Sequence, residues 1–141
     1  MSNPPDATAV QEKRATSFNL DFDEASNLVT VAAHRRADMD TRLESLRALR
    51  RDPRFREDYD ILCKFLDKKH VPDSAACRHL GLTISAFFRG QKVALVVSKA
   101  ELQKLKDGIR VFNTGRVELN VFNKTTSARS WLLSQREALP H

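Results

Sequence analysis

The chain has 141 residues, of which 41% are hydrophobic and 30% are charged, and its formal net charge is +6. This length predicts one domain with a substantial core and excludes two ordinary domains. The longest apolar runs have four or five residues, as in 93–97, whereas a membrane-spanning helix needs about 20. The first residues lack the apolar segment of a secretory signal, and the two cysteines are expected to be reduced thiols. We therefore expect a cytoplasmic protein with no membrane contact.

Both ends of the chain differ from its middle in composition. Residues 1–16 contain Pro4 and Pro5 and few apolar side chains, which is typical of a flexible tail. Residues 136–141 are interpreted in the same way. We therefore expect one domain over residues 17–135.

The domain is predicted to begin with a β-hairpin. Residues 18–22 alternate apolar and polar side chains with a period of two, as in a half-buried strand. The turn-rich segment 23–27 separates them from a second strand at Leu28–Ala33. We expect the first strand to be an antiparallel edge strand.

A helix and a central strand are predicted next. Either Asp38 or Asp40 caps a helix that runs to about Arg51, and Pro53 stops it. Residues 59–66 then carry apolar side chains on both faces. This pattern is typical of a central strand that is covered on both sides.

Residues 73–88 predict two short helical pieces. Asp73 and Ser74 are N-cap candidates for a helix that continues to Leu80. We expect Gly81 to interrupt this helix and residues 83–88 to form the second piece.

The clearest strand of the sequence follows. Lys92–Val97 is a continuous run rich in β-branched residues, which is typical of a buried parallel strand. Ser98 and Glu101 then form a capping box that opens another helix. The apolar stripe of this helix comprises Leu102, Leu105, Ile109 and Phe112.

One more strand and helix complete the predicted order. Residues 117–122 form the strand, and Thr125 or Thr126 caps a helix with Ala128 and Trp131 facing inward. The order ββαβαβαβα predicts an α/β fold. We expect a mainly parallel five-stranded sheet with an antiparallel N-terminal edge strand and about four helices.

Three stretches resemble the SpoIIAA-like (STAS-like) domain family. They are 49–55 (LRRDPRF), 92–98 (KVALVVS), and Val121 and Phe122 followed by 127–132 (SARSWL). The resemblance covers about residues 17–135. It implies a single SpoIIAA-like domain, built as a four-turn βα superhelix with one added strand. It also implies a role in interaction or regulation.

The resemblance singles out one serine. Relatives that act as regulatory switches are phosphorylated on a serine in a D-S-S step after the third strand. Asp73 and Ser74 match its first two positions, Ala75 replaces the second serine, and the loop 68–72 is shorter than usual. The resemblance therefore makes Ser74 a candidate phosphoacceptor, and the alternative role for its side chain is N-capping.

Basic residues follow the predicted strands at their carboxyl ends, where ligands bind in parallel α/β sheets. In a parallel arrangement these cations share one rim, and the N-termini of the following helices point towards it. The cations are Arg35, Arg36, Lys68, Lys69, Lys99 and Lys124. We hypothesise that the rim receives an acidic or phosphorylated protein partner or a nucleotide-like ligand. The alternative is a solvated charged edge.

The favoured function is a non-catalytic protein-interaction or regulatory module, with a homodimer as one arrangement. The alternative is a DNA-binding protein with a helix-turn-helix at residues 76–90, in which Gly81 forms the turn. A small enzyme or ligand carrier that uses the rim is the third and least favoured alternative.

Two observations argue against the DNA-binding alternative. Residues 83–90, the second helical piece, contain no Asn or Gln to read bases. Residues 35–56 have eight arginines but only Phe55 for base stacking, so we interpret them as a solvated helix face and expect no nucleic-acid partner.

The sequence predicts no metal, cofactor or catalytic site. Cys63, His70, Cys77 and His79 are candidate metal ligands, but their spacing matches no usual zinc site. The chain has four glycines and lacks a P-loop, a dinucleotide-binding motif and a nucleophile elbow. We therefore expect a protein that is not an enzyme.

Overall fold

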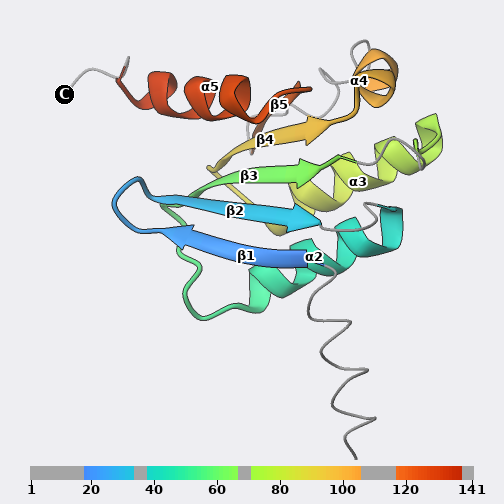
Figure 1. Ribbon diagram of the computed structural model, residues 1–141. Coiled ribbons are helices and arrows are strands. Elements are labelled where there is room, and N and C mark those ends of the chain that lie inside the picture. The colour runs from blue at the N-terminus through green and yellow to red at the C-terminus, as the bar shows by residue number, and fades with distance from the viewer. Residues whose placement is uncertain (1–17, 34–37, 67–70, 106–116, 138–141) are drawn as a thin grey trace, which may run out of the picture.

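Strands and helices alternate along the chain (Figure 1). The computed structural model describes residues 18–33, 38–66, 71–105 and 117–137. The strands are β1 (Phe18–Asp23), β2 (Leu28–Ala33), β3 (Asp60–Phe65), β4 (Lys92–Val97) and β5 (Glu118–Phe122). The helices are α2 (Met39–Arg51), α3 (Ser74–Phe87), α4 (Lys99–Leu105) and α5 (Thr125–Glu137).

The five strands form one sheet, and their spatial order is the same as their order in the sequence. β1 pairs antiparallel with β2, from Phe18 opposite Ala33 to Asp23 opposite Leu28. The pairs β2–β3, β3–β4 and β4–β5 are parallel. The predicted α/β fold, with four helices and an antiparallel N-terminal edge strand, is therefore confirmed.

The helices cover the two faces of the sheet unequally (Figure 1). Each crossover from β2 to β5 adds a strand in the same direction, so crossovers of the usual hand place α2, α3 and α4 on one face. Leu46, Ile84 and Leu105 from these helices belong to the main core. α5 packs on the opposite face, where Ala128 and Leu132 join a smaller core. Because α5 lies mainly over β3, β4 and β5, it covers Leu28 at the start of β2 but leaves most of that face of β1 and β2 open.

β4 is the centre of both cores. Val93, Leu95 and Val97 point into the main core, and Ala94 and Val96 point into the smaller one. All five side chains are buried. A strand with helices over both faces must be apolar at every position, which confirms the prediction for this segment.

Helix α3 corrects the sequence prediction for residues 73–88. It runs without interruption from Ser74 to Phe87, and Gly81 is one of its buried residues. Cys77, Leu80 and Ile84 share the buried stripe of α3. Burial of that stripe outweighs the helix penalty of about 1 kcal/mol for glycine. The predicted break at Gly81 is therefore wrong, and residues 76–90 do not form a helix-turn-helix.

Local hydrogen bonds decide where two other helices begin. Asp38, rather than Asp40, is the N-cap of α2, because its carboxylate accepts a hydrogen bond from the Thr41 N–H at 2.9 Å. The Lys124 carbonyl accepts the Ala128 N–H at 3.2 Å. The cap position of α5 is thus Lys124, one residue before the earlier of the two predicted caps.

Some predictions lie outside the described residues, namely those for 1–16, 138–141, Ile109 and Phe112. Arg136 and Glu137, predicted to belong to the C-terminal tail, are the last two residues of α5. Among the helices that the structure describes, none is both long and apolar enough to cross a membrane.

Candidate functional site

The parallel strands β2–β5 all end at one edge of the sheet, which we call the carboxyl edge. Two of the predicted rim cations are described there: Lys99 and Lys124, which follow β4 and β5 closely, are both exposed. Arg35, Arg36, Lys68 and Lys69 lie outside the described residues. They belong to the short segments that follow the ends of β2 and β3.

The helix N-termini at the carboxyl edge already hold hydrogen-bond acceptors of the protein itself. The Asp73 carboxylate accepts the Ala76 N–H at 2.8 Å and caps α3, as Asp38 caps α2. The Ser98 hydroxyl oxygen accepts the Glu101 N–H at 3.2 Å at the start of α4. Two of these three caps are anionic, and they reduce the pull of the helix dipoles on a further anion. Any attraction of this edge for anions therefore depends on its cations.

Ser74 does not cap α3, because Asp73 holds that role. It is the first residue of the helix, and its side chain is exposed. Together with Ala75 and Arg78 it lines a shallow depression. A phosphate on Ser74 would stand beside Arg78, which favours it, and next to the Asp73 carboxylate, which opposes it.

Beneath the carboxyl edge lies a buried ion pair that the sequence analysis did not anticipate. The Arg42 guanidinium of α2 donates to both carboxylate oxygens of Glu101 in α4, at 2.5 and 2.7 Å. It also donates to the carbonyl of Phe65, the last residue of β3, at 3.3 Å. Both charged side chains are 0% exposed. The expectation that the arginines of 35–56 form a solvated face is therefore wrong for Arg42.

Only half of the predicted capping box at the start of α4 forms. The Ser98 half of the box is present, but the Glu101 carboxylate is bound to Arg42 instead of the Ser98 backbone. The pair joins two helices on the same face of the sheet, and every one of its charges has a partner. Its role in the fold is positional.

Neither cysteine is suited to thiolate chemistry. Cys63 in β3 is completely buried, and this burial raises its pKa to about 12. Burial is also the main cause that raises the pKa of Cys77, followed by the nearby Glu101 carboxylate. No cluster of three or more possible metal ligands occurs in the part of the chain that the structure describes. His70 lies outside that part.

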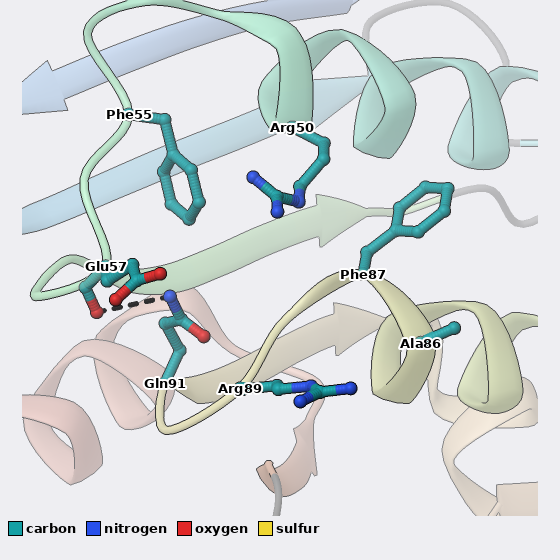
Figure 2. A pocket seen from close by; sticks show the side chains of 7 residues that line it. All are labelled: Arg50, Phe55, Glu57, Ala86, Phe87, Arg89 and Gln91. Carbon is teal, nitrogen blue, oxygen red and sulfur yellow. Dashed lines mark hydrogen bonds between the residues drawn. The ribbon is translucent and has the colours of Figure 1, made fainter.

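The opposite edge, where the parallel strands begin, holds a pocket that was not predicted (Figure 2). Its volume is about 330 Å³. It is lined by Arg50, Phe55, Glu57, Ala86, Phe87, Arg89 and Gln91. These residues come from the ends of α2 and α3 and from the loops that lead into β3 and β4. No periodic pattern marks them, so only the folded arrangement brings them together.

A second, shallower groove lies on the sheet face that α5 leaves uncovered. It is lined by Asn19, Asp21, Thr30, Ala32, Ala33, Lys64 and Leu66. Leu66, expected on a covered face, is instead 48% exposed, because α5 does not extend over this part of the sheet. The lining is mostly polar and small.

Comparison with known proteins finds no matching family model, curated protein or solved structure. The α/β fold agrees with what the STAS-like resemblance implies.

Proposed function

We propose that this chain is a non-catalytic interaction module of the STAS-like type, and that its carboxyl edge binds an anionic group of another protein. The observation that carries the proposal is the parallel pairing of β2 to β5. This pairing brings four strand ends to one edge, and each strand is followed within five residues by lysine or arginine. Lysine and arginine that follow several strands at one edge attract acidic or phosphorylated partners.

The state of the buried ionisable groups supports a binding role over catalysis. General acids, bases and nucleophiles need accessible groups with suitable pKa values. Arg42 and Glu101 neutralise each other away from solvent, and the Cys63 thiol is buried with a pKa of about 12. Within the described ranges, the carboxyl edge instead offers exposed cations, Lys99 and Lys124.

The test is a titration of the full chain with an acidic peptide that carries one phosphoserine, and with the same peptide unphosphorylated. The rim variant replaces Arg35, Lys68, Lys69 and Lys124 with alanine. Exposed ion pairs contribute about 0.5 kcal/mol each, so losing four should weaken phosphopeptide binding about 30-fold. Binding to the wild type should also weaken when the salt is raised from about 50 to about 200 mM.

A matched control removes the same charge elsewhere. It replaces four exposed arginines with alanine, namely Arg47, Arg51, Arg56 and Arg129. We expect this control to retain most of the affinity. If both variants lose affinity equally, net charge alone explains the binding and the rim is not the site. Unchanged binding in the rim variant would also overturn the proposal.

A further inference from the structure

The pocket at the edge where the parallel strands begin contains a buried hydrogen-bond acceptor, the side-chain oxygen of Gln91. The Gln91 side-chain nitrogen donates to the Glu57 carbonyl at 3.1 Å, while the Gln91 Oε1 atom is buried and has no hydrogen-bond partner in the part of the chain that the structure describes. Gln91 as a whole is only 3% exposed. The bond to Glu57 fixes the amide orientation, because exchanging its oxygen and nitrogen would place two oxygens against each other. Buried polar atoms are nearly always paired, so this atom is open to a donor other than the described residues, and a ligand in the pocket can supply one.

Two arginines, Arg50 and Arg89, line the same pocket. Arg50 and Arg89 form no hydrogen bond or ion pair with any residue of the described ranges, whereas the nearby Arg54 and Arg56 pair with Asp52 and Asp58. Guanidinium groups bind carboxylates and phosphates through two parallel hydrogen bonds. Arg50 and Arg89 are thus available to an oxyanion, although both also lie near helix ends whose dipoles favour cations.

The pocket has two chemically different sides. Figure 2 shows Glu57 and Gln91 on one side, with Arg89 below Gln91, and Arg50 across from them with Phe55 and Phe87 beside it. The first side offers oxygen acceptors, the Gln91 amide oxygen and the Glu57 carboxylate. The second side offers positive charge. Aromatic rings that flank the space favour a flat or apolar body between the two polar ends.

We propose that this pocket binds a small organic molecule with an amino group at one end, an oxyanion at the other and an apolar body between them. The amino group donates to Gln91 Oε1, and the oxyanion binds Arg50, which lies across the pocket from Gln91 in Figure 2. A volume of about 330 Å³ lies at the lower end of the range for small-molecule sites. The site is separate from the rim of the proposed function, since the two lie at opposite edges of the sheet.

The test uses four probes and ligand-observed NMR with the full chain. 4-(Aminomethyl)benzoate carries both polar groups, 4-methylbenzoate lacks the amino group, and benzylamine lacks the anion. 4-(Aminomethyl)phenyl phosphate keeps the aminomethyl group and replaces the carboxylate with a phosphate, so it tells which oxyanion Arg50 prefers. We expect the two probes with both groups to bind about tenfold more tightly than either single-group probe.

Variants assign the binding to the named atoms. Gln91→Met keeps the side-chain size, and it should lower the affinity for 4-(aminomethyl)benzoate to that of 4-methylbenzoate while leaving 4-methylbenzoate unchanged. Arg50→Met should weaken both acids about tenfold and leave benzylamine unaffected. Arg51→Met is the matched control, because Arg51 is an exposed neighbour in α2 that does not line the pocket.

Two results would overturn the proposal. One is that neither two-group probe binds the wild-type protein at about 10 mM. The other is that Arg50→Met and Arg51→Met change the affinity equally. Arg50 is exposed, so its replacement leaves the fold intact and the test remains decisive even where Gln91→Met is destabilised. Binding at the rim is unaffected by either result.

Discussion

Arg42 and Glu101 stand 59 residues apart in the chain, yet they form a doubly hydrogen-bonded ion pair that is sealed from solvent. The Arg42 guanidinium also lies 5.3 Å from the centre of the Phe65 ring. The pair connects α2, α4 and the end of β3. It therefore fixes the relative positions of three elements just below the carboxyl edge.

Arg42→Met should destabilise the fold by about 3–5 kcal/mol, because it leaves the Glu101 carboxylate buried without its partner. Urea unfolding followed by circular dichroism measures the change. Arg47→Met is the control, since the Arg47–Glu44 pair is exposed and 3.8 Å apart, and its loss should cost less than about 1 kcal/mol. The double variant Arg42→Met/Glu101→Leu should recover most of the lost stability. Equal stability of Arg42→Met and wild type would contradict the buried pair.

Cys63 should resist alkylation in the native protein. With a pKa of about 12, only about one thiol in 10,000 is ionised at pH 8, and reagents must also reach a closed core. Iodoacetamide labelling of the Cys77→Ala variant, followed by mass spectrometry, isolates this residue. The same variant unfolded in urea should label rapidly. Fast labelling of the folded variant would show that Cys63 is accessible.

Asp73 should contribute more to the stability of the fold than Ser74, because Asp73 is the N-cap of α3. Asp73→Ala removes the acceptor of the Ala76 N–H and should cost about 1 kcal/mol. Ser74→Ala should change the stability by less than about 0.5 kcal/mol, since its exposed side chain does not cap the helix. Thermal unfolding compares the two variants. A larger effect of Ser74→Ala would reverse the assignment of the cap.

Ionised Asp52 should stabilise the fold, so its protonation in acid should lower the free energy of unfolding. Hydrogen bonds from the Arg54 side chain, at 2.8 and 3.0 Å, are the main cause that lowers the pKa of Asp52 below its usual value. In the unfolded chain this carboxyl titrates near 3.9, so the folded state favours its ionised form. The contribution of Asp52 to the free energy of unfolding is present above about pH 4, and it is lost as the pH falls through the lower pKa of the folded state.

Arg54→Met tests this linkage. It should raise the folded pKa of Asp52 towards its usual value, which carboxyl-carbon NMR measures directly. It should also reduce the loss of stability between about pH 4 and pH 2. An Asp52 pKa that is the same in both proteins would show that the Arg54 contact does not persist in solution.

Much of this architecture was evident from short-range patterns. The period of two in β1, the β-branched run of β4 and the acidic caps of the helices all act within a few residues. Leu28–Ala33 and Lys92–Val97 are strands with the predicted bounds. From the alternation of strands and helices, the parallel sheet also follows. α3 is the exception, because the burial of Leu80 and Ile84 against the core overrides the local signal of Gly81.

The sequence by itself therefore determined which segments are strands and helices, and that β2 to β5 run parallel. Only the tertiary structure decided that Arg42 is interior rather than solvated, that Glu101 binds Arg42 rather than closing a capping box, and that Gln91 shares a pocket with Arg50. Local patterns depend on neighbours a few residues away. These features depend instead on the crossovers, which place α2, α3 and α4 on one face and bring side chains that are distant in the sequence close together.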